Sequence, residues 1–144
     1  MPGTYTLDAS IFLSAFNPYD AGHEECHRLL GRLQEGATPI VVPTHLLSEV
    51  AAVISRGRQD GALASEFADT LSRLPHLIWV PVDMTLAQQA SALAAKHRLR
   101  GSDAVYAAVA IRFGSTFVTL DREQRERVSD ALPTLYPAEA LDRG

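Results

Sequence analysis

The chain has 144 residues and is 47% hydrophobic, which is enough to bury a sizeable core in one domain. Its formal net charge of -4 argues against binding nucleic acid by bulk electrostatic attraction, and its single cysteine, Cys26, excludes an intrachain disulfide and a cysteine-based zinc site. It has no apolar run near the ~20 residues of a membrane span and no secretory-signal pattern at its N-terminus. We therefore expect a single domain over residues 1–144 of a cytoplasmic protein without a membrane span.

The first half of the chain alternates short β-prone runs with helical stretches. Asn17-Pro18 stops the first helix and Gly36 closes the second. We expect the side chains of Asp20 and Thr44 to cap the second and third helices. In chain order, the expected elements are a strand at 4–7, helices at 11–16 and 20–34, a strand at 39–42, and helices at 44–55 and 62–74.

The second half continues this alternation, with Thr85 and Ser102 as expected helix caps. A last short strand contains Pro133, which is tolerated only at a sheet edge or a strand start. The expected elements are a strand at 77–80, helices at 86–97 and 102–114, a strand at 116–120, a helix at 122–128 and an edge strand at 132–136. Strands that alternate with helices predict a three-layer α/β/α sandwich with a mainly parallel central sheet.

The helix from Ser102 is nearly all apolar around its circumference, so it is predicted to lie at the centre of the molecule. The residues that cover most of its circumference are Val105, Tyr106, Val109, Ala110 and Phe113. Asp103 lies in its first turn, where an acid interacts favourably with the helix dipole. The same position would also suit a metal ligand on a rigid element, and the helix alone does not decide between these roles.

Three further acids stand in comparable positions. Asp8 and Asp121 each follow a predicted strand, and ligands of parallel sheets bind outside the carboxyl ends of the strands. Glu49 falls within or beside the apolar stripe of its helix, so it either finds a buried partner or reaches solvent at the edge of the stripe. We expect Asp8, Glu49, Asp103 and Asp121 to converge in one crevice.

Four carboxylates in one crevice repel one another unless cations or protons neutralise them. Ligands that are all oxygen favour Mg²⁺ or Mn²⁺, ions that suit phosphodiester hydrolysis. Ser10 and Thr119 each lie two residues from an acid, a spacing that returns a side chain to the same face of an extended strand. They are therefore candidates to support Asp8 and Asp121, although β-propensity or turn chemistry also explains them.

These residues resemble the PIN-domain ribonucleases, and in particular the toxins of VapBC-type toxin–antitoxin pairs. The resemblance covers essentially the whole chain and is carried by Asp8-Ala9-Ser10, Glu49, Ser102-Asp103-Ala104 and Thr119-Leu120-Asp121. It implies a PIN-like fold, Mg²⁺- or Mn²⁺-dependent cleavage of single-stranded or structured RNA, a homodimer and a cognate antitoxin that covers the site. Carried over, the four acids are catalytic, with Asp8, Asp103 and Asp121 as metal ligands.

RNA contact in an acidic protein requires local positive charge. Arginines flank two of the acids, and arginine suits bidentate phosphate binding, although solvated helix ends explain them equally well. The candidate RNA-binding residues are Arg98, Arg100, Arg122 and Arg125, with Arg127 in the same group.

An early aromatic segment with Phe12, Phe16 and Tyr19 either packs in the core or forms a surface for a partner protein. Two other functions stay open beside the toxin. One is a housekeeping PIN-type nuclease without an antitoxin, and the other is a catalytically inactive α/β binding module.

Overall fold

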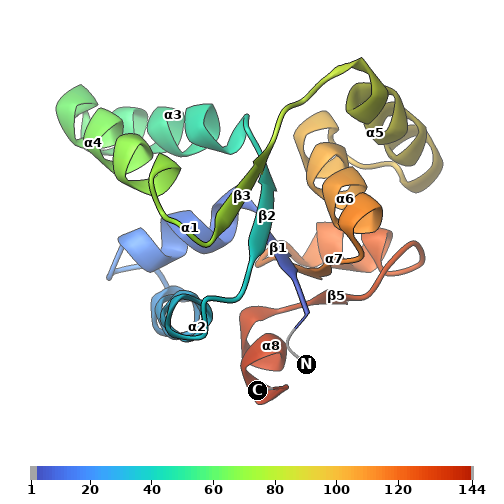
Figure 1. Cartoon of the computed structure of the whole chain (residues 1–144). Coiled ribbons are helices and arrows are strands. Elements are labelled where there is room, and N and C mark those ends of the chain that lie inside the picture. Colours follow the sequence, from blue (N-terminus) through green and yellow to red (C-terminus); the bar gives the residue numbers. More distant parts are fainter. Residues whose placement is uncertain (1–2, 144) are drawn as a thin grey trace.

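A computed structural model describes residues 3–143, so residues 1, 2 and 144 of the expected domain lie outside it. Within this range, five parallel strands form one sheet in the order β3-β2-β1-β4-β5 (Figure 1). The strands are β1 (Tyr5–Leu7), β2 (Ile40–Pro43), β3 (Leu77–Val80), β4 (Thr116–Val118) and β5 (Thr134–Leu135). The predicted parallel sheet is confirmed, and the proline-containing run does supply an edge strand.

Helices cover both faces of this sheet, with α1 to α4 on one side and α5 and α6 on the other (Figure 1). They are α1 (Ala9–Phe16), α2 (His23–Glu35), α3 (Leu46–Arg58), α4 (Gly61–Ser72), α5 (Met84–His97), α6 (Gly101–Phe113), α7 (Arg122–Val128) and α8 (Pro137–Asp142). The three-layer α/β/α sandwich is therefore confirmed. Helix α8 was not predicted, because six residues are too few to show a helical period.

All four predicted helix N-caps were wrong. Helix α5 is capped by Asp83, whose carboxylate accepts the N–H of Leu86, and not by Thr85. No side chain caps α3, where the backbone carbonyl of Thr44 accepts the N–H of Leu47 instead. Helix α2 begins only at His23, so Asp20 lies in the preceding turn. Several polar residues precede each helix, and sequence alone does not say which of them turns its side chain back.

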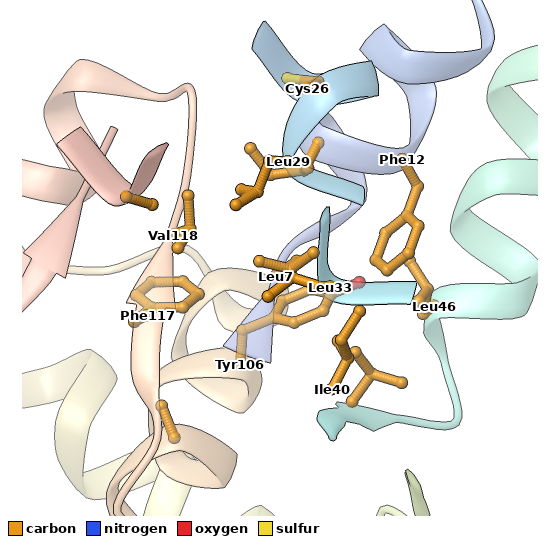
Figure 2. Close-up of a cluster of buried hydrophobic side chains, with 14 of the residues drawn as sticks. Leu7, Phe12, Cys26, Leu29, Leu33, Ile40, Leu46, Tyr106, Phe117 and Val118 are labelled. Carbon is orange, nitrogen blue, oxygen red and sulfur yellow. The ribbon is translucent and has the colours of Figure 1, made fainter. Parts of the chain in front are cut away.

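The largest group of buried apolar side chains lies between the sheet and α1 to α3 (Figure 2). Phe12 is only 2% exposed and belongs to this core, so the first of the early aromatics is ordinary packing. Tyr106 brings its ring into the same cluster from α6, on the opposite face of the sheet.

Helix α6 is the central helix that its composition predicts. Its buried residues are Ala104, Tyr106, Ala107, Ala108, Val109 and Ala110. Small side chains let it pack closely against β1 and β2. Phe113 departs from the prediction, since it lies at the last turn of the helix and is 43% exposed. In the part of the chain that the structure describes, no helix combines the length and the apolar character needed to cross a bilayer.

Candidate active site

The four candidate acids all lie where a helix begins at the carboxyl edge of the sheet. Asp8 is the N-cap residue of α1 and Asp121 that of α7, while Glu49 and Asp103 occupy the first turns of α3 and α6. Helices that connect parallel strands run back against them, so their positive N-terminal ends gather at this edge. Strand β1 pairs with β2 on one side and with β4 on the other, so the strand order reverses at β1. Parallel α/β sheets bind ligands outside the carboxyl ends of the strands at such a point.

Side chains from these helix ends line one open cavity of about 350 Å³. The lining residues are Asp8, Ala9, Ser10, Leu13, Glu49, Val53, Arg100, Ser102, Asp103, Tyr106, Asp121 and Gln124. The structure thus brings together all four predicted acids and Ser10. Thr119 lies behind the lining, where it is fully buried against Asp8.

Asp8 is the most buried of the four acids, with only 5% of its surface exposed. Burial raises the pKa of its carboxyl to about 6, and the hydrogen bonds from Ser10 and Thr119 offset part of this rise. One carboxylate oxygen accepts the backbone N–H and the hydroxyl of Ser10, and the other accepts the hydroxyl of Thr119. The Thr119 hydroxyl in turn accepts the N–H of Asp121, at 3.0 Å. Both predicted supporting residues therefore contact Asp8.

Asp103 and Asp121 share one cation, the guanidinium group of Arg100. Its Nε donates to Asp103 at 2.9 Å, and its terminal nitrogen donates to Asp121. Burial raises the pKa of Asp103 although Arg100 opposes this, whereas the backbone N–H of Gln124 is the main reason that the pKa of Asp121 is lowered. Arg100 was predicted to contact RNA, and here it forms ion pairs inside the acidic site.

Glu49 is half-buried and finds a network of partners, so it both contacts other side chains and keeps part of its surface in solvent. Its carboxylate accepts the hydroxyl of Ser102 at 2.7 Å and the phenol of Tyr106 at 2.5 Å. The Nε2 atom of His45, one helical turn earlier, lies 3.2 Å away. Burial by itself would raise the pKa of Glu49, but these three donors together hold it below its usual value.

Ser102 is therefore not the cap of α6. That helix begins at Gly101, with Arg100 at the N-cap position and no side-chain cap. The Ser102 hydroxyl turns away from the helix end and towards Glu49, because the convergence of α3 and α6 offers it a charged acceptor. A serine at a helix start predicts a cap. Glu49, the acceptor that competes for its hydroxyl, is 53 residues distant in the chain, so the sequence pattern does not show it.

The remaining predicted RNA-binding arginines do not line the cavity. Arg122 pairs with Glu126, and Arg125 forms a two-point ion pair with Glu139 at the start of α8. Arg98 lies in the turn before α6, where its backbone carbonyl accepts a hydrogen bond from Arg127. Helix α8 is thus one reason why Arg125 is held away from the site.

Three residues of the site were not singled out from the sequence. Tyr106 was expected only to pack, although its hydroxyl reaches Glu49. His45 lies four residues before Glu49, a spacing that places both on one helix face and could have signalled the contact. Gln124 is 2% exposed, and its side-chain amide donates to the backbone carbonyl of Asp103 at 3.3 Å.

The chemistry of this donor set suits a hard divalent cation. Asp8, Asp103 and Asp121 offer only carboxylate oxygens, and the burial that raises the pKa values of Asp8 and Asp103 is a penalty that a nearby cation would relieve. Among residues 3–143, however, no three acidic, histidine or cysteine side chains are gathered closely enough to hold a metal ion. In this arrangement, Arg100 supplies the positive charge between Asp103 and Asp121.

Comparison with known proteins identifies the family to which this fold with its acidic cavity belongs. The family model described as PIN domain matches residues 5–129, so the chain belongs to the PIN-domain family. No curated protein matched the chain significantly.

Three solved structures share the fold at low sequence identity. VapC20 from Mycobacterium tuberculosis, described as a sarcin–ricin loop cleaving toxin, is 21% identical, with 85% of this chain and 94% of that chain covered and a TM-score of 0.70. VapBC2 from Rickettsia felis, bound to a DNA fragment from its promoter, is 17% identical, with 92% and 98% covered and a TM-score of 0.69. PAE2754 from Pyrobaculum aerophilum is 19% identical, with 98% and 88% covered and a TM-score of 0.72.

Proposed function

We propose that this protein is a Mg²⁺- or Mn²⁺-dependent endoribonuclease and the toxin of a type II toxin–antitoxin pair. The observation that carries the proposal is the single cavity in which four helix N-termini present Asp8, Glu49, Asp103 and Asp121. Membership of the PIN-domain family supports it, and so does the similarity in fold to a toxin that cleaves the sarcin–ricin loop.

The division of labour that we propose follows from the environment of each acid. A divalent cation held by Asp8, Asp103 and Asp121 would stabilise the negative charge that develops on the phosphate during cleavage. Ser10 and Thr119 orient the carboxylate of Asp8, and Gln124 ties the first turn of α6 to α7 through the carbonyl of Asp103. Glu49 is ionised at neutral pH, and the hydroxyls of Ser102 and Tyr106 that donate to it fix the orientation of its negative charge in the cavity.

Cleavage of a fluorescent RNA oligonucleotide by the purified protein tests the proposed activity. We expect no cleavage in EDTA, cleavage after excess Mg²⁺ or Mn²⁺ is added, and no cleavage of DNA of the same sequence. Asp103→Asn should lower the rate on the order of a hundredfold, because one of the three carboxylates proposed to hold the cation loses its charge.

Asp83→Asn is the matched control for this assay. Asp83 is also an aspartate at a helix start, but it lies outside the cavity, and asparagine caps helices as well as aspartate does. Full activity in EDTA, or equal losses in the two variants, would contradict the proposal. Cleavage of DNA alone would favour the housekeeping nuclease, and absence of any cleavage would favour the inactive binding module.

A second protein, the antitoxin, is proposed to dock in a groove beside the cavity. The groove is lined by Leu13, Phe16, Asn17, Asp20, Val53, Ile54, Gly57 and Arg58, and it shares Leu13 and Val53 with the acidic cavity. Tyr19 nearby is 92% exposed, so two of the three early aromatics are at this surface and not in the core. A polypeptide in the groove would therefore lie beside the proposed catalytic acids.

Gly57→Glu tests this docking surface. A side chain at Gly57 meets nothing within 4 Å, so the fold should tolerate a glutamate that places a charge in the groove. Co-purification with the product of the neighbouring gene should weaken at least about tenfold, because a buried unpaired charge is costly in an interface. Gly31→Glu is the control, since Gly31 is equally open but lies on α2 outside the groove. Equal affinities of the two variants would count against this surface.

The proposed homodimer has apolar surface available on a different part of the molecule. Ile111 and Phe113, near the end of α6, are 45% and 43% exposed. A second copy of the chain on this surface would remove these side chains from water.

A further inference from the structure

Arg100 reaches two of the three carboxylates that the proposed function assigns to the cation. Its Nε atom is 2.9 Å from Asp103, and a terminal nitrogen of the same guanidinium contacts Asp121. Asp103 begins α6 and Asp121 begins α7, so one side chain bridges two elements across the mouth of the cavity. The guanidinium thus stands between the carboxylates where a divalent ion would also bind.

We propose that Arg100 and the divalent cation compete for Asp103 and Asp121. In the metal-free protein, Arg100 acts as a positioning residue that neutralises the two acids and keeps them at the cavity. Cation binding displaces the guanidinium towards the mouth, where it is free to contact an RNA phosphate. This inference rests on the proposed metal dependence and adds a role for Arg100 that differs from simple RNA contact.

The surroundings of Arg100 make this displacement inexpensive. Its side chain is 70% exposed, so the freed guanidinium is solvated by water. The carboxylates of Asp103 and Asp121 are only 19% and 32% exposed, and a divalent ion offers them twice the charge of the guanidinium group. Arg100 donates to Asp103 and Asp121, whereas the carboxylate of Asp8 accepts from Ser10 and Thr119. Asp8 therefore adds attraction for the ion without adding attraction for the arginine through direct contact.

Isothermal titration of Mn²⁺ into the metal-free protein tests the competition directly. Arg100→Gln removes the competing charge, so Mn²⁺ should bind about three- to tenfold more tightly than to the unmodified protein. A purely structural role predicts the opposite sign, because loss of the bridge would loosen Asp103 and Asp121 and weaken ion binding. Arg100→Lys should give an intermediate affinity, since a single ammonium group cannot form the same two-point bridge.

Arg122→Gln is the control for long-range charge. Arg122 directly follows Asp121 in the chain, but its guanidinium pairs with Glu126 outside the cavity. We expect its removal to change Mn²⁺ affinity less than twofold. An equal gain in both variants would overturn the competition, because it would show that only net charge matters.

A second readout follows Arg100 itself. In the ¹⁵N-labelled protein, the Arg100 Nε–H signal, assigned from its loss in Arg100→Gln, should shift as Mg²⁺ is added, because the bond to Asp103 breaks. Ion binding that leaves this signal and the Arg100→Gln affinity unchanged would overturn this inference alone. Absence of Mn²⁺ binding in both proteins would overturn it together with the proposed metal dependence.

Discussion

Asp8→Asn is expected to make the metal-free protein more stable at neutral pH while it lowers the rate of RNA cleavage on the order of a hundredfold. The ionised carboxylate of Asp8 is unfavourable in the folded chain, since burial raises its pKa from 3.8 to about 6. One pKa unit corresponds to about 1.4 kcal/mol, so ionisation of this group costs on the order of 3 kcal/mol of folding stability. Asparagine removes that cost but has only one acceptor oxygen for the three donors of Ser10 and Thr119, so we expect a net gain of about 1–2 kcal/mol.

The pH dependence gives this prediction a definite sign. Between about pH 4 and pH 6, folded Asp8 holds a proton that the unfolded chain releases, so this group makes the protein less stable as pH rises through that window. The advantage of Asp8→Asn should therefore be largest above about pH 6 and vanish near pH 4. Urea denaturation in EDTA at pH 4.5 and pH 7.5 measures the difference.

Asp121→Asn is the control of opposite sign in the same experiment. The pKa of Asp121 is lowered, mainly by the backbone N–H of Gln124, so its ionised form stabilises the fold. That variant should be no more stable than the unmodified protein at pH 7.5. Both variants should lose RNA cleavage on the order of a hundredfold. A destabilised Asp8→Asn at pH 7.5, or a gain that persists unchanged at pH 4.5, would contradict the raised pKa.

The second large effect is expected for Glu49→Gln, which should destabilise the protein by about 2–3 kcal/mol and also reduce cleavage. Glu49 accepts from Ser102 and from Tyr106, whose side chain is almost fully buried. Glutamine replaces one acceptor oxygen by an NH₂ group, so one of these hydroxyls loses its acceptor. A buried hydrogen bond to a charged group contributes about 1.5–3 kcal/mol, and an unsatisfied partner adds to the loss.

A double-mutant cycle with Tyr106→Phe separates this contact from general disruption. Tyr106→Phe keeps the ring in the core and removes only the hydroxyl that reaches Glu49. If the contact is strong, the double variant should lose less free energy of unfolding than the two single variants lose in sum. We expect this difference to be at least about 1 kcal/mol. The changes are measured by urea denaturation. If the change in the double variant equals the sum of the two single changes, Glu49 and Tyr106 act independently.

Much of the fold could be predicted because it follows from patterns of neighbouring residues. Breakers such as Asn17-Pro18 and the alternation of strands with helices predicted the layers and the parallel sheet. The same patterns put Asp8 and Asp121 after strands, and parallel topology then gathers those strand ends at one edge. The residues that cap the helices were harder to predict. Asp83 and Thr85 are two residues apart and both suit a cap, and only the structure shows that Asp83 accepts the backbone N–H of α5.

By itself, the sequence determined the three-layer architecture, the central position of α6 and the candidate acids, since these follow from the periods and breakers of neighbouring residues. Only the tertiary structure decided what each side chain contacts. Tyr106 meets Glu49 across 57 positions of the chain, and Arg100 meets Asp121 across 21. It also turned Arg125 towards Glu139 and away from the cavity. Such partners depend on how helices from distant segments are brought side by side, and no pattern of three or four residues contains that information.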